Sequence, residues 1–239
     1  MCIQTNLVKV IIMKHVFLWI MGCLFCSVVN AQEQRLFDEY LRKVGDKAEM
    51  FVGKMEPGYA STVYINHPYW LTDNFSQGDV VFRGLTYRDV SVRYDAYLKQ
   101  LVVNTPVRHL NICVSMHLVD KFTLDGIDYE RRDGDFVALL FDSSHMELIE
   151  QVNVSVKEVY LSQVSFKHGF VHNVKYYVLR DGQKHEVDKL QSVLKLYPTI
   201  KKELKRFAKM YHLDFREHRR SSLISVMKYA DELLTQSLN

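Results

Sequence analysis

The side chains that most often perform chemistry in enzymes are present in this sequence, but their spacing matches no catalytic or metal-binding motif. A serine hydrolase would call for Gly-x-Ser-x-Gly, and a zinc site for His-Glu-x-x-His or two Cys-x-x-Cys pairs. None of these patterns occurs, and the single Cys23-x-x-Cys26 lies within residues 1–31. His168 and His172 have i, i+4 spacing, but a strand is expected there, which would separate them by about 13 Å. A Gly-rich phosphate loop is also absent. The sequence therefore predicts no metal ion and no other cofactor.

Acidic residues fall mostly at expected turns, where an aspartate caps its own backbone. They are Asp89, Asp95, Asp125, Asp133 and Asp181. A glycosidase pair needs only two carboxyl groups that are close in space, so the sequence leaves a hydrolase open as a third functional hypothesis.

Cys113 lies in the apolar run 110–114 with no charged neighbour in sequence that would activate a thiolate. We expect a small buried hydrophobic residue there, with a catalytic thiol as the alternative. The other three cysteines lie within residues 1–31, so Cys113 is the single cysteine of residues 32–239 and no disulfide is expected within that range.

Tyr69 and Trp70 belong to a His-Pro-Tyr-Trp cluster in a predicted loop. Such aromatic side chains could form an exposed platform that stacks a sugar or another flat ligand. The alternative is that they fill one end of the sheet, because large aromatic side chains bury much apolar area.

The strongest surface signal is a cluster of positive charge near the C-terminus. Residues 189–220 hold ten Lys or Arg and three Asp or Glu, a net charge of +7, whereas residues 32–188 hold 18 basic and 23 acidic residues, a net of −5. On a helix, five of these cations share the side opposite the apolar residues: Lys201, Lys202, Lys205, Arg206 and Lys209. They predict contact with an anionic surface such as lipid headgroups or an acidic partner; a solvated helix side is the alternative. Nucleic acid is not expected, because basic and aromatic residues do not interleave.

The elements that carry these residues are mainly strands. Val90, Val92 and Tyr94 share one side of a period-two alternation, with polar residues between them. Residues 78–104 predict three short strands joined by tight turns, since Gly84 permits a turn and Pro106 ends the run.

The strand pattern continues to about residue 188, and Asp-Gly pairs at 125–126, 133–134 and 181–182 indicate tight hairpins. We expect a short helix over 33–46, a first strand over 48–52, and C-terminal helices over 190–197, 199–212 and 221–237. The predicted fold class is α+β: an antiparallel β-meander over residues 32–188, as a sandwich, open roll or partial barrel, with two to three helices in 189–239 packed on it.

Residues 1–31 are typical of a signal peptide. Lys9 and Lys14 precede an apolar run at 16–29, and Val29-Asn30-Ala31 places small or modest residues where signal peptidase cleaves. The alternatives are a transmembrane helix and a lipoprotein attached through Cys23. Met13 could be the true start in place of Met1. No transmembrane helix is expected in the mature chain, which we expect in the periplasm or at the outer membrane.

The stretch Gly78-Asp79-Val80-Val81-Phe82-Arg83-Gly84, followed by Tyr87-x-x-Val90 and Tyr94-Asp95, resembles a set of uncharacterised exported proteins of the Bacteroidota. His67-Pro68-Tyr69 and the tail segment Leu194-x-Leu-Tyr-Pro match that group too. The resemblance implies an envelope protein and supplies no active site.

These observations favour a non-enzymatic envelope protein that binds or scaffolds a partner. The alternative is a ligand- or glycan-binding module that uses the aromatic side chains near Tyr69 and Trp70.

Overall fold

The computed structural model describes residues 32–238, with side chains up to residue 236. The predicted signal peptide lies outside the described residues. The chain divides into two compact units, residues 1–48 and 49–239. In the first unit residues 32–44 are helical and Gly45–Lys47 form a 3-10 turn, which confirms the helix predicted over 33–46.

The second unit is built on strands that all belong to one sheet. In chain order they are β1 (Lys54–Met55), β2 (Ser76–Phe82), β3 (Leu85–Asp95), β4 (Gln100–Asn104), β5 (Asn111–Cys113), β6 (Val119–Leu124), β7 (Ile127–Arg132), β8 (Asp135–Asp142), β9 (Glu147–Tyr160), β10 (Phe166–Arg180) and β11 (Gln183–Glu186). The order across the sheet is β1-β5-β4-β3-β2-β6-β7-β8-β9-β10-β11, and every pair is antiparallel.

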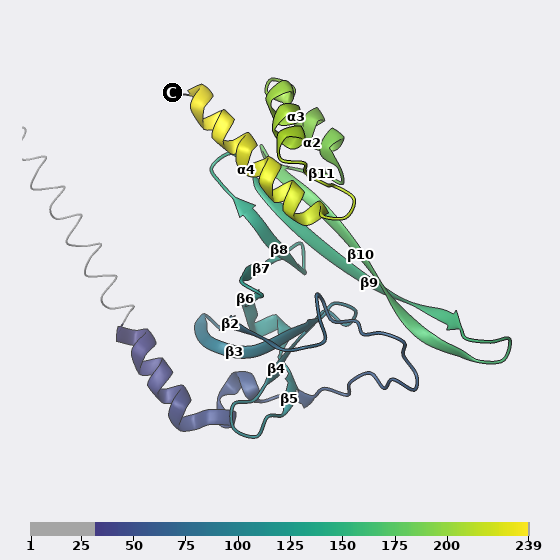
Figure 1. The fold of residues 1–239 in the computed structure, drawn as a ribbon. Coiled ribbons are helices and arrows are strands. Elements are labelled where there is room, and N and C mark those ends of the chain that lie inside the picture. The colour runs from purple at the N-terminus through teal and green to yellow at the C-terminus, as the bar shows by residue number, and fades with distance from the viewer. Residues whose placement is uncertain (1–31, 239) are drawn as a thin grey trace, which may run out of the picture. The chain divides into compact units, whose positions relative to one another are not determined.

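This order joins two meanders. The first runs β2 to β5, the chain then returns so that β6 pairs with β2, and the second runs β6 to β11 (Figure 1). Because all the described strands form one sheet that is not closed, the two-sheet sandwich among the predicted arrangements does not form. The α+β class and the antiparallel meander are confirmed.

The local strand predictions hold where alternation and turn chemistry agree. The three strands expected in 78–104 are β2, β3 and β4. The Asp-Gly hairpins are confirmed as well: at the first, Asp125 and Gly126 have φ of 51° and 72°, as the twist-matched two-residue turn requires.

The strand expected over 48–52 was wrong. Glu49–Phe51 form a 3-10 turn instead, which buries Met50, and pairing begins only after Gly53. A Cβ on Gly53 would come within 2.6 Å of the Cys113 carbonyl oxygen, so the chain enters the sheet edge through this glycine.

One cross-strand row runs across the inner face of the sheet, the face that carries its buried core. In order it contains Tyr87, Val80, Phe122, Tyr129, Ala138, Glu150 and Tyr176. Direct cross-strand neighbours have Cβ atoms about 5 Å apart, and all seven residues are buried. Glu150 is therefore a carboxyl group in an otherwise uncharged buried row.

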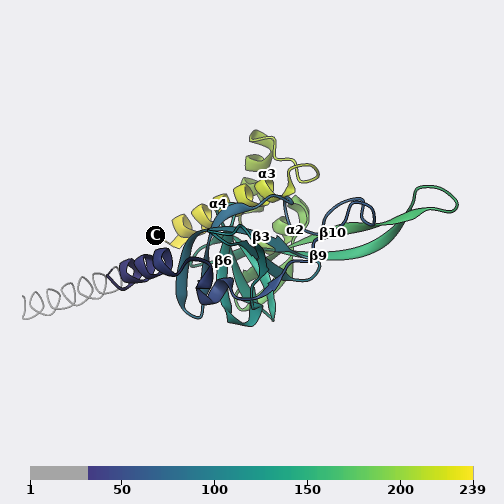
Figure 2. The same cartoon turned by 90° about the horizontal axis from the view of Figure 1, so that it is seen from below.

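Three C-terminal helices cover the inner face near β9, β10 and β11 (Figures 1 and 2). They are α2 (Leu190–Leu196), α3 (Lys201–Met210) and α4 (Arg219–Leu238), and all three predicted helices are confirmed. Their core with the sheet includes Leu148, Val178, Leu194, Leu204 and Met227. Within residues 32–238 no helix is long and apolar enough to cross a membrane.

The strands β9 and β10 extend well beyond their neighbours. Between Gln151–Tyr160 and Phe166–Lys175 they pair with each other and with no other named strand, which gives a two-stranded arm about 30 Å long. Figures 1 and 2 both show the arm projecting from the remainder of the sheet.

Candidate functional site

The structure places Tyr69 and Trp70 in different surroundings. Tyr69 is buried, its hydroxyl donates a 2.7 Å hydrogen bond to Glu56, and the Arg93 guanidinium lies 4.0 Å from its ring centroid. Arg93 in turn forms a buried ion pair with Glu56. Burial, followed by the bond to Glu56, raises the pKa of Tyr69. Tyr69 is therefore a packing residue at the sheet, which was the alternative to an exposed aromatic platform.

Trp70 is half-buried and lies near polar residues of three strands and one helix. Its ring centroid is 6.2 Å from that of His172, and its indole N–H lies close enough to Tyr129 and Glu150 to favour their charged forms. We call this set the Trp70 cluster; its members are Trp70, Tyr129, Glu150, His172, Tyr176 and Arg220.

The cross-strand row explains why the cluster forms. Ala138 lies between Tyr129 and Glu150, and its small side chain leaves room for the larger groups on either side. Tyr176 is the direct partner of Glu150 on β10. Arg220 comes from the first turn of α4, and its Nε lies 3.1 Å from Glu150 Oε2.

Burial governs the electrostatics of the pair. The Glu150 side chain is 2% exposed and that of Arg220 is 26% exposed. Burial raises the pKa of Glu150, and the Arg220 charge, Tyr176 and Trp70 oppose the shift. Burial also raises the pKa of Tyr129 and of Tyr176, so both hydroxyls keep their protons at neutral pH.

Several buried polar atoms of the cluster have no hydrogen bond of normal geometry within the part of the chain that the structure describes. They are Trp70 Nε1, Tyr129 OH, both Glu150 oxygens, His172 Nε2, and Arg220 Nε and Nη2. The Glu150–Arg220 contact is thus an ion pair whose N–H is not aligned with the acceptor. Buried polar atoms are normally paired, whereas the donors and acceptors of this cluster contact one another without reaching hydrogen-bond geometry.

The basic residues of α3 lie as predicted. Leu204 and Ala208 are buried, and Phe207 stacks on Tyr229 at 4.2 Å. The five cations on the other side are all exposed, and none forms an ion pair with any residue in the range 32–238. We call Lys201, Lys202, Lys205, Arg206 and Lys209 the basic face of α3.

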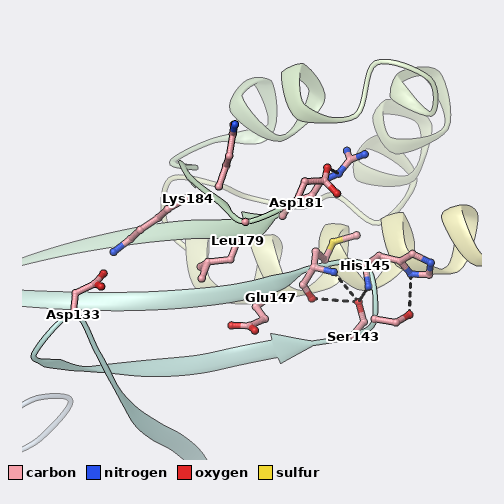
Figure 3. Close-up of a pocket in the computed structure, with 12 residues that line it drawn as sticks. Asp133, Ser143, His145, Glu147, Leu179, Asp181 and Lys184 are labelled. Atoms are coloured by element: carbon pink, nitrogen blue, oxygen red, sulfur yellow. Dashed lines mark hydrogen bonds and ion pairs between the residues drawn. The ribbon is translucent and has the colours of Figure 1, made fainter.

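A groove of about 460 Å³ lies at the turns that precede β9 and follow β10 (Figure 3). Its charged side chains partly neutralise one another: Arg180 Nε lies 3.0 Å from Asp181, and Glu147 pairs with Arg132 at 3.2 Å. Asp133 lies at the opposite end of the groove from His145 in Figure 3.

His145 has a serine and an aspartate beside it, but not in the arrangement of a catalytic triad. Its Nδ1 lies 2.7 Å from Asp231, and the same nitrogen lies 3.5 Å from Ser144 Oγ. A triad uses the two imidazole nitrogens for different partners. The groove therefore gives the hydrolase hypothesis no Ser-His-Asp constellation.

Cys113 and Asp95, the remaining candidate residues, lie close enough for the Asp95 charge to act on the thiol. Cys113 is a free, partly buried thiol, and burial raises its pKa, which disfavours a reactive thiolate. Asp95 accepts hydrogen bonds from the backbone of Tyr97 and Leu98, a turn cap as predicted. In residues 32–238 no group of three or more His, Cys, Asp or Glu side chains could hold a metal ion.

Sequence reasoning singled out Trp70 but missed the residues around it. A signal for Glu150 was available: Leu148, Glu150 and Val152 share one side of an alternating strand, so a carboxylate occupies an inward position. Arg220 offered no such signal, because its partner comes from a strand far away in the chain.

No protein-family model, curated protein or solved structure matches the chain.

Proposed function

We propose that the chain is a non-enzymatic exported protein of the cell envelope that binds or scaffolds an anionic partner through the basic face of α3. We place it in the periplasm or at the outer membrane, in the exported Bacteroidota group that it resembles. Cleavage after Ala31 predicts a mature N-terminus at Gln32; a diacylated Cys23 found by mass measurement would instead make it a lipoprotein.

One observation carries this proposal. The five cations of α3 are exposed and form no ion pair with any residue in the range 32–238, while the opposite side of the helix is buried. Exposed like charges on one surface attract an anionic partner and raise its rate of association. Leu204 belongs to the C-terminal core, Ala208 is buried and Phe207 stacks on Tyr229, so the charges lie on a helix that is packed against the rest of the unit.

Charge reversal tests the proposal. The variant Lys201→Glu/Lys202→Glu/Lys205→Glu and the wild-type chain would each be purified from the native envelope, and the proteins and lipids that accompany them compared. A matched control reverses three exposed lysines elsewhere, Lys54, Lys121 and Lys228. We expect the α3 variant to lose its partner and the control to keep it.

The two sources of anionic charge give different results in the same experiment. A protein partner appears as a specific band, whereas a lipid partner appears only in the lipid fraction. Unchanged co-purification of the α3 variant would remove the proposal.

The second candidate is a ligand- or glycan-binding module at the Trp70 cluster. It is favoured by the buried donors and acceptors beside an aromatic ring that form no hydrogen bond of normal geometry, since sugars offer both hydroxyl groups and an apolar ring side. Titration of tryptophan fluorescence with envelope glycans tests it, with Trp70→Phe as control. The absence of any response in the wild-type chain would contradict it.

A further inference from the structure

The end of the β9–β10 arm exposes apolar side chains over an uncharged stretch. We call residues 160–166 the arm tip; their sequence is Tyr-Leu-Ser-Gln-Val-Ser-Phe. Tyr160, Leu161, Val164 and Phe166 are 69%, 57%, 95% and 48% exposed. Exposed apolar groups gathered at one place mark an interaction surface more often than scattered ones do.

The arm is held in place by the loop that precedes β2. Ile65 N–H donates to the His168 carbonyl and His168 N–H donates to the Val63 carbonyl, both at 2.9 Å. Asn66 exchanges two side-chain hydrogen bonds with the Phe170 backbone. Gly169 lets Ile65 lie against the arm, since a Cβ there would meet Ile65 at 3.1 Å.

The same loop is fixed to the first meander at its other end. The backbone N–H of Trp70 donates to the Tyr94 carbonyl, and the backbone N–H of Ala96 donates to the Pro68 carbonyl. Tyr64 stacks on Phe170 with centroids 5.0 Å apart. The arm is therefore braced along β10, and the tip beyond the brace is presented on a supported strand pair.

The chemistry of the tip fits a lipid bilayer. Leu161 and Ser162 both donate their N–H groups to the Ser165 carbonyl, at 2.8 and 3.1 Å, and Val164 N–H lies 3.4 Å from Ser162 Oγ. These three backbone N–H groups thus have acceptors within the turn, which lowers the cost of placing them in lipid.

Charged groups begin only behind the apex. Lys157, Glu158 and Lys167 lie behind it on the two strands. Lys167 donates to the Ser61 carbonyl at 2.7 Å, which leaves Lys157 to meet lipid phosphates, and Tyr160 OH donates to Glu158 at 2.8 Å. Tyrosine at such a boundary is typical of the membrane–water interface. A convex tip exposed on several sides is also surrounded more completely by a bilayer than by a flat protein surface.

We propose that the arm tip inserts its apolar side chains into the interfacial layer of a lipid bilayer. This contact is separate from the basic face of α3, because it needs no anionic lipid. It should persist in vesicles of pure phosphatidylcholine and at high salt, where an electrostatic contact weakens.

An added tryptophan tests the insertion directly. The sequence holds two tryptophans, Trp19 and Trp70, so their emission is subtracted as the wild-type spectrum. With phosphatidylcholine vesicles, the difference spectrum of Val164→Trp should shift to shorter wavelength and be quenched by brominated acyl chains. Val171→Trp, a partly exposed site on the arm behind the brace, is the matched control and should remain unchanged.

A second variant measures the apolar contribution. Leu161→Asp/Val164→Asp should weaken vesicle binding by about tenfold or more, since charged side chains are costly in the bilayer. Equal spectra for Val164→Trp with and without vesicles, or equal quenching at positions 164 and 171, would overturn the proposal. A shift to shorter wavelength that appears only when envelope proteins are added, without quenching by brominated acyl chains, would also overturn it, in favour of a protein partner. The α3 variant should behave as wild type here, so the two proposals can fail separately.

Discussion

Arg220 and the basic face of α3 lie close together in sequence but in opposite environments. Arg220 is largely buried and pairs with a carboxylate that is 2% exposed, whereas the five cations of α3 are exposed and form no ion pair with residues 32–238. A buried charge that loses its partner leaves a costly unpaired group. An exposed charge contributes little to folding and is available for binding. The comparison separates a cation that the fold needs from cations that the fold does not need.

Arg220→Met should give the largest loss of stability, because it leaves Glu150 buried without its cation. Breaking a fully buried pair costs about 3–5 kcal/mol; since the Arg220 side chain is a quarter exposed, we expect about 2–4 kcal/mol in the free energy of unfolding. Urea denaturation measures it, with the exposed Arg216→Met as the control.

The double variant Glu150→Leu/Arg220→Met sharpens this result. Removing both charges should cost much less than the sum of the single variants, since no unpaired charge remains. A stability of Arg220→Met within about 0.5 kcal/mol of Arg216→Met would mean that the buried pair does not hold the fold.

Ala138→Leu should cost about 1–3 kcal/mol, because it overpacks the space between Tyr129 and Glu150 in the cross-strand row. The same urea measurement applies. If Ala138→Leu leaves the free energy of unfolding unchanged, the space between Tyr129 and Glu150 is larger than the strand register implies.

The pair should also give stability a dependence on pH. Because burial raises the Glu150 pKa above its usual 4.5, the folded state binds a proton more readily than the unfolded state in the window above that value. The free energy of unfolding therefore falls as pH rises through this window, by at most about 1.4 kcal/mol per pH unit. Denaturation of the wild type and of Glu150→Gln at several pH values isolates the contribution of Glu150. If the difference between their free energies of unfolding is the same at every pH, the expected pH dependence is contradicted.

The smallest effect on stability is expected at α3. Lys201→Glu/Lys202→Glu/Lys205→Glu should change the free energy of unfolding by less than about 0.5 kcal/mol per site. Thermal unfolding beside the Lys54/Lys121/Lys228 control tests this. A large loss would mean that the basic face serves the fold after all.

Local patterns predicted much of this fold. Alternation around Val90 and Val92 and the Asp-Gly pairs predicted strands and turns, since side-chain period and positive φ are local properties. The return of β6 to pair with β2 depends on long-range pairing, which one sequence does not encode locally. Residues 48–52 were predicted wrongly because the close approach of Gly53 to Cys113 is also a tertiary feature.

The candidate site divides in the same way. The basic face of α3 was predictable because its residues lie on one helix at a fixed spacing. The Trp70 cluster was not, because it gathers a loop, three strands and α4. Besides Trp70 itself, only Glu150 could be suspected, from its inward position beside Leu148 and Val152.

The most direct test of the central claim is the salt dependence of binding to native envelope fragments, measured by sedimentation for the wild type and the Lys201→Glu/Lys202→Glu/Lys205→Glu variant. We expect the wild-type affinity to fall steeply as salt rises. The variant should lose the salt-dependent part of the affinity, retain only the salt-independent part expected from the arm tip, and keep the wild-type urea midpoint. A folded variant that retains the wild-type affinity and the same salt dependence would contradict the assignment of partner binding to α3.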